Sequence, residues 1–149
     1  MIRTIKLLTI ALLFSGLSSC TKDDVPAPDP NILFRATLNG ANERPTPNTS
    51  TGAGTSTLIF NNDTKIFTVT TSYSGLTGTP TGGHVHKGDV TIAGPVIFNF
   101  GTTLATPITF TSIAIDASQE ADLKAGLWYT NVHTVAFPGG EIRGQLIKQ

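Results

Sequence analysis

Cysteine is nearly absent from the chain, because Cys20 is the only one among 149 residues. A single thiol excludes an internal disulfide and every zinc site built from several cysteines. The sequence also lacks G-x-S-x-G, the serine nucleophile motif of α/β-hydrolases. Because this nucleophile motif is missing, the sequence favours a binding or structural function over an enzymatic one.

Charged residues are scarce as well, at 13% of the sequence, and ten basic residues balance ten acidic ones. A nucleic-acid-binding surface needs clustered positive charge, so no nucleic acid is expected as a partner. The glycine-rich stretch GLTGTPTGG (75–83) is not followed by a helical pattern. It therefore lacks the helix N-terminus with which glycine-rich loops bind phosphate.

No apolar run reaches the roughly 20 residues that a membrane-spanning helix needs. The apolar stretch 7–17 follows Arg3 and Lys6 and leads through small residues to Cys20. This order of positive, apolar and small residues is typical of a secretory signal peptide, which we predict for residues 1–19. The alternative is a buried N-terminal helix, but nothing after Cys20 continues the apolar pattern.

The sequence LSSC (17–20) resembles the lipobox of bacterial lipoproteins, in which the cysteine becomes the lipidated first residue. The resemblance implies a membrane partner, reached through lipid on Cys20. Residues 20–31 (CTKDDVPAPDPN) are polar and proline-rich, which predicts a flexible tether. CTKDD also resembles a surface-export signal of bacterial lipoproteins. The expected location is the outer membrane, facing the cell surface or otherwise the periplasm.

From residue 32 onward the apolar residues recur with period two, which predicts strands. Glycine, proline, asparagine and aspartate cluster between these runs, as they do in turns. The predicted strands are 32–38, 55–61, 65–73, 95–100, 107–115, 128–135 and 140–148. Short strands at this spacing predict one all-β domain over 32–149, an antiparallel sandwich or barrel.

One segment departs from period two. The stretch DASQEADLKAG (116–126) contains helix formers, a potential N-cap at Asp116 or Ser118, and Gly126 as a stop signal. We therefore predict a short helix near 117–125.

The three histidines are His84 and His86 in HVHK (84–87), and the distant His133. Because strand side chains alternate between faces, a core-facing Val85 places His84 and His86 together on the opposite face. The same argument turns His133 outward if Trp128 and Val132 face the core. The three imidazoles converge only if the two strands are neighbours or a loop folds over them, and such a set would suit copper or zinc as a metal site. The alternative is that the rings form structural hydrogen bonds to neighbouring backbone. For a fourth ligand we consider Asp89 and solvent.

Four motifs stand in order along the chain: FRATLNGANERP (34–45), GHVHKG (83–88), AGPVIF (93–98) and LKAGLWYTNVHTVAFPGGEIRGQL (123–146). Together they resemble the CHRD domain, first described as a repeat in chordin and common in bacterial exported proteins. The resemblance implies an immunoglobulin-like or barrel-like all-β fold. The matching positions are Glu43, His84, His86, Gly88, Asn131, His133, Thr134, Gly139, Gly140, Glu141, Arg143, Gly144 and Gln145. The histidine layout is also similar to that of copper/zinc superoxide dismutase, another Greek-key sandwich. The two resemblances together imply an antiparallel Greek-key sandwich or barrel of the immunoglobulin-like or superoxide-dismutase-like kind. That enzyme uses more histidines than this chain has.

Parity in GEIRGQL (140–146) places Ile142 and Leu146 toward the core, and Glu141 and Arg143 on the other face. We expect Arg143 to form an ion pair with Glu43, as a structural clasp between the first and last strands. The alternatives are a solvated strand face and a catalytic carboxylate.

The sequence thus predicts a lipid-anchored, extracytoplasmic domain that acts as a binding or adhesion module for an extracellular protein or glycan. Two other functions stay open. One is a copper- or zinc-binding protein for storage, delivery or superoxide-dismutase-like redox chemistry, with His84, His86 and His133 as ligands. The other is a purely structural component of the envelope.

Overall fold

The computed structural model describes residues 27–149. The predicted signal peptide, the lipidation site Cys20 and residues 21–26 of the predicted tether lie outside the described residues. Within residues 27–149, no helix is long and apolar enough to cross a membrane.

The described residues form a single antiparallel sheet of nine strands, curled into a half-barrel. Its strands are β1 (Asn31–Asn39), β2 (Ala53–Asn61), β3 (Phe67–Ser74), β4 (Pro80–Lys87), β5 (Val96–Asn99), β6 (Ile108–Thr111), β7 (Trp128–Thr134), β8 (Ile142–Gln145) and β9 (Ile147–Lys148). A short 3₁₀ turn, η1 (Gly40–Asn42), follows β1. The all-β prediction is confirmed, as one curled sheet.

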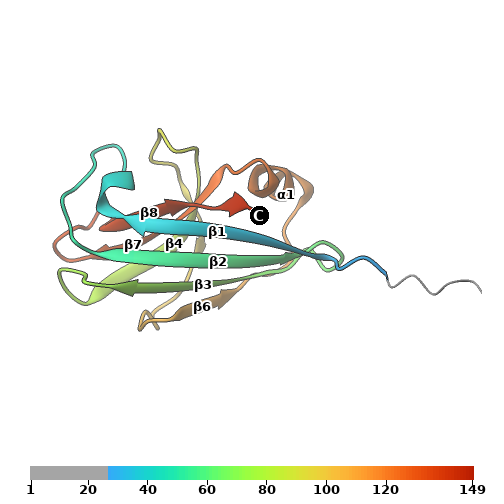
Figure 1. The fold of residues 1–149 in the computed structure, drawn as a ribbon, viewed down its shortest axis with the longest axis horizontal. Coiled ribbons are helices and arrows are strands. Elements are labelled where there is room, and N and C mark those ends of the chain that lie inside the picture. Colours follow the sequence, from blue (N-terminus) through green and yellow to red (C-terminus); the bar gives the residue numbers. More distant parts are fainter. Residues whose placement is uncertain (1–26) are drawn as a thin grey trace, which may run out of the picture.

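The order of strands across the sheet is β5-β4-β7-β8-β1-β2-β3-β6, with β9 paired to β1. The meander β1-β2-β3 is local, whereas the chain crosses between the two halves of the sheet from β3 to β4, from β5 to β6, and from β6 to β7. In Figure 1 the long strands β1, β2 and β3 lie in front, with β4 and β7 behind them. The two edge strands approach each other, since Phe98 of β5 and Phe110 of β6 have ring centroids 6.0 Å apart.

The predicted helix is present as α1 (Ala117–Lys124). It begins with a capping box, in which the Asp116 side chain accepts from the Gln119 backbone N–H and the Gln119 side chain accepts from the Asp116 N–H. The chain leaves the helix through Gly126 at φ 72°, a conformation that glycine adopts without a steric penalty. Leu123 anchors α1 in the core, because its side chain is fully buried.

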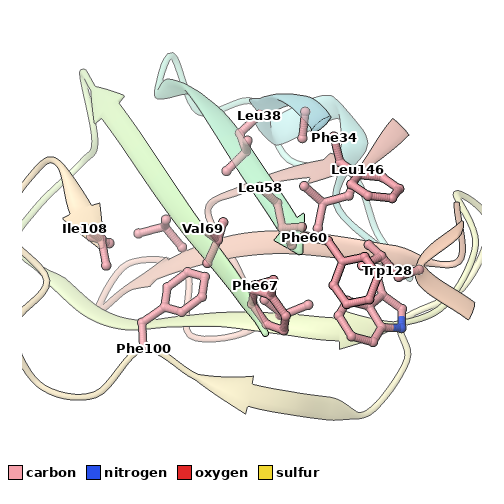
Figure 2. Packing of buried hydrophobic residues seen from close by; sticks show 14 of the residues in the cluster. Phe34, Leu38, Leu58, Phe60, Phe67, Val69, Phe100, Ile108, Trp128 and Leu146 are labelled. Atoms are coloured by element: carbon pink, nitrogen blue, oxygen red, sulfur yellow. The ribbon is translucent and has the colours of Figure 1, made fainter. Parts of the chain in front are cut away.

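The core fills the inside of the curl (Figure 2). Trp128, Phe67 and Phe98 form an aromatic centre, with Phe67 lying 5.7 Å from Trp128 and 5.0 Å from Phe98 between ring centroids. Val85 and Val132 are fully buried in the same cluster. Side chains alternate along a strand, so the residues next to these valines on β4 and β7 point to the outer face of the sheet.

Hydroxyl groups also reach the interior. The Ser56 hydroxyl lies 2.7 Å from the hydroxyl of Thr71 and 2.8 Å from that of Thr130, and all three side chains are buried. These three residues come from β2, β3 and β7, so the hydrogen bonds join the two halves of the curl.

We expect Ser56→Ala to lower the free energy of unfolding by about 1–3 kcal/mol, because it leaves the Thr71 and Thr130 hydroxyls without their shared partner in a dry interior. Urea denaturation of the purified protein measures this loss. The matched control is Ser72→Ala at an exposed position of β3, where a change within about 0.5 kcal/mol is expected. Equal losses in both variants would contradict the bridging role of Ser56.

Candidate metal centre

Two neighbouring strands carry the three histidines. His84 and His86 lie on β4, His133 lies on β7, and the two strands pair side by side (Figure 1). In their register Gly82 is opposite His133 and His84 is opposite Asn131. All three rings therefore stand on the outer face of this strand pair, as the parity of Val85 and Val132 predicts.

The rings form a compact cluster. The Nδ1 atom of His84 lies 3.0 Å from the Nε2 atom of His133. One ring nitrogen from each histidine lies within 4.8 Å of the others. The structure thus brings together all three predicted ligands.

Backbone carbonyls fix the orientation of two rings. His86 Nδ1 lies 2.8 Å from the carbonyl oxygen of Gly94, and His133 Nδ1 lies 2.9 Å from that of Pro138. A carbonyl oxygen only accepts hydrogen bonds, so these contacts place the hydrogen of each neutral ring on Nδ1. The Nε2 lone pairs of both rings then face the cluster, as in metal-binding histidines whose other nitrogen donates to a carbonyl.

Acceptors outnumber hydrogens inside the cluster. His86 Nε2 is buried and has no hydrogen-bond partner among the described residues. His133 Nε2 lies 3.0 Å from Asn131 Oδ1. With its Nδ1 hydrogen donated to Pro138, His133 Nε2 is an acceptor, and a donor for it comes from the Asn131 side chain only if the amide presents its nitrogen. A cation at the centre of the cluster would give His86 Nε2 its missing partner.

Protonation is the other way to supply a positive charge, and burial opposes it. Burial lowers the pKa of His84 to about 4, and the neighbouring His133 and His86 rings lower it further. Burial also lowers the pKa values of His86 and His133 below their ordinary range. The three rings are therefore neutral at pH 7, which is the form that binds metal ions.

A second layer of contacts supports His86. The Tyr129 ring stacks on His86 with centroids 4.7 Å apart, and the Tyr129 hydroxyl accepts from the Gly94 N–H at 3.0 Å. The Arg143 guanidinium lies 3.4 Å from the Tyr129 ring centroid and donates to the carbonyls of Ile92 and Asp89. Tyr129 and Arg143 thus hold both His86 and the loop that supplies its carbonyl partner.

The expected ion pair between Glu43 and Arg143 is absent from the three ion pairs found among the described residues. The prediction was wrong because Arg143 points toward the loop between β4 and β5, where backbone carbonyls and Tyr129 occupy its guanidinium. Asn42 makes the clasp instead, by donating from Nδ2 to the Arg143 backbone carbonyl at 3.1 Å and to that of Thr37 at 3.3 Å.

The face that carries Glu141 and Arg143 is buried, not solvated. Glu141 accepts hydrogen bonds from the Ser50 hydroxyl, the Thr134 hydroxyl, and both the N–H and the hydroxyl of Thr77. Burial alone would raise the pKa of Glu141, but these donors bring it below its ordinary value. The carboxylate therefore has a structural role, since it ties two loops to β7.

Asp89 does not belong to the histidine cluster. Its Oδ1 accepts from the N–H and the hydroxyl of Thr91 at 2.7 and 2.6 Å. Among the described residues, the group of close metal-binding side chains contains only the three histidines. Solvent is left as the source of a fourth ligand.

The sequence indicated the three histidines of the cluster but not the residues that orient them. Gly94 and Pro138 act through backbone carbonyls, which leave no signal in the side-chain pattern. Asn131 and Arg143 were among the positions that match the family. The sequence did not show that Asn131 contacts His133 or that Arg143 holds the loop that contains Gly94. A signal was available for Tyr129, because it shares the strand face of Asn131 and His133.

The fold and the site together define an all-β domain with a three-histidine cluster on the outer face of its sheet. The family model of the CHRD domain matches residues 34–146. The chain therefore belongs to the CHRD domain family. No curated protein and no solved structure matches it.

The buried carboxyl of Glu43 is expected to make the stability of the protein depend on pH. Its side chain is 3% exposed, Oε1 has no hydrogen-bond partner among the described residues, and burial raises its pKa to about 7 despite the nearby Arg143 charge. The carboxyl in the unfolded chain has a pKa of 4.5. The folded state therefore binds more protons between these values, and stability falls as the pH rises through this window.

We expect Glu43→Gln to stabilise the protein more at pH 8 than at pH 5, by about 2–3 kcal/mol, because the amide carries no charge to bury. Urea denaturation at both pH values measures the difference. The control is Asp63→Asn in the exposed turn between β2 and β3. A pH-independent effect of Glu43→Gln would show that Glu43 does not titrate in this window.

Proposed function

We propose that this CHRD domain binds one zinc or copper ion through His84 Nδ1, His86 Nε2 and His133 Nε2. The observation that carries the proposal is the buried His86 Nε2, which has no partner among the described residues and belongs to a cluster whose other nitrogens lie within 4.8 Å. Buried polar atoms in native proteins nearly always have partners. A metal ion suits His86 Nε2 because the other two histidines supply ring nitrogens beside it.

The donor set favours zinc or copper over other ions. Three neutral imidazoles without a carboxylate suit Zn²⁺ and Cu²⁺, whereas Ca²⁺ and Mg²⁺ need oxygen ligands. Tetrahedral zinc with bonds of about 2.1 Å requires nitrogens about 3.4 Å apart. The separations of 3.0 Å to at most 4.8 Å bracket this value, so small rotations of the rings would complete the site.

The proposed setting is the outside of the cell. The signal-like residues 1–19 and the lipobox-like LSSC support an exported chain anchored by lipid on Cys20, where the domain would store or deliver metal or carry out redox chemistry. A binding or adhesion role toward an extracellular protein or glycan stays a prediction, as does a purely structural one.

The metal proposal is tested by calorimetric titration of the purified protein with Zn²⁺ and Cu²⁺, followed by elemental analysis. We expect one ion per chain, and a loss of affinity of at least about 100-fold in His86→Ala, because two ligands remain. The matched control is Asp89→Asn, which should bind as the wild type does because Thr91 occupies Asp89 Oδ1. Unchanged binding in folded His86→Ala, or no binding by the wild type, would refute the proposal.

The anchor is tested by expressing the full chain in a bacterium supplied with labelled fatty acid. We expect label and membrane association in the wild type, and neither in Cys20→Ala, because the acyl chains attach to that thiol. The control is Ser18→Ala, which keeps the cysteine and should still be labelled. Labelling of Cys20→Ala would contradict the lipid anchor.

A further inference from the structure

A pocket of about 620 Å³ opens beside the histidine cluster. His84 and His133 line it together with Thr81, Asn99, Thr102 and Pro138, whereas His86 is buried and does not line it. An ion held by the three rings would therefore be reached from this pocket. The pocket is of the size that accommodates small molecules in other proteins.

Asn99 is the residue of β5 that lies opposite His84 in the sheet. The two residues are direct partners in the antiparallel pairing of β4 with β5. Directly opposite residues share a face, with Cβ atoms about 4.5–5.5 Å apart. Asn99 Oδ1 accepts from the Gly101 N–H at 2.7 Å, which orients the amide. The hydrogens on Asn99 Nδ2 are left for an acceptor in the pocket.

The charges also favour an anion. Three neutral imidazoles leave both positive charges of a divalent ion uncompensated. The residues that line the pocket all belong to the described part of the chain, and none of them carries a charge. The hydroxyls of Thr81 and Thr102 and the Asn99 amide can donate hydrogen bonds. A negatively charged ligand would thus meet a positive ion and neutral donors, without a competing carboxylate.

We infer that the pocket binds a small carboxylate, with one oxygen on the open coordination position of the metal ion and the other accepting from Asn99 Nδ2. This inference rests on the proposed metal site. On this inference the metal ion keeps one coordination position at which ligands exchange, whereas a structural metal site has protein ligands at every position.

The test uses the full chain loaded with Cu²⁺, whose visible and electron paramagnetic resonance spectra report the ligands. Acetate is the carboxylate probe, and azide is the probe for the open position alone. We expect saturable spectral changes with both anions. Asn99→Asp should weaken acetate binding by at least about tenfold, because it replaces a donor with a like charge. Copper binding should not weaken in this variant.

Two comparisons isolate the role of Asn99. Asn99→Ala should weaken acetate binding more than azide binding, since azide needs no second contact. Asn31→Asp, at the exposed start of β1 and outside the pocket, adds the same charge and should bind acetate as the wild type does.

The outcomes separate the two proposals. If copper binds but neither anion changes the spectra, or if Asn99→Asp binds acetate as tightly as the wild type, the carboxylate pocket is refuted and the metal site stands. If neither copper nor zinc binds, both proposals are refuted.

Discussion

The pairing of β4 with β7 is the constraint on which the candidate site depends. Val85 and Val132 are fully buried, so alternation fixes His84, His86 and His133 on the opposite face. The register, which sets Gly82 against His133, brings the rings of the two strands together. A shift of one residue would exchange the faces and turn the histidines into the core. The hydrophobic core therefore positions the polar site.

Backbone carbonyls orient the neighbouring histidine rings so that their free nitrogens could bind a metal ion. Gly94 and Pro138 accept from the Nδ1 atoms of His86 and His133, which leaves both Nε2 lone pairs facing inward. The loop that contains Gly94 is held in turn by Arg143, and by Gln145 through the Gly88 carbonyl. Arg143 and Gln145 of the GEIRGQL segment thus support the site, whereas the buried Glu141 ties two other loops to β7.

Period-two patterning predicted most of the strands and the outward direction of the histidines, because these features depend on local sequence. Helix formers with a capping residue and a glycine stop predicted α1 for the same reason. Sequence alone did not predict that β4 and β7 are neighbours, since pairing between distant strands is decided by the whole fold. The partner of Arg143 was missed for the same reason, because backbone carbonyls of a loop compete with Glu43. Serine and threonine are mostly exposed in folded proteins, yet Ser56, Thr71 and Thr130 meet inside the curl.

The central claim is that His86 and His133 present Nε2 lone pairs to a common centre. Long-range ¹H–¹⁵N correlation spectra of the metal-free protein at pH 7 test it most directly, because they report which ring nitrogen carries the hydrogen. We expect Nδ1–H forms for both rings, and a shift of both Nε2 resonances when one equivalent of Zn²⁺ is added. Nε2–H forms that do not respond to Zn²⁺ would contradict the account.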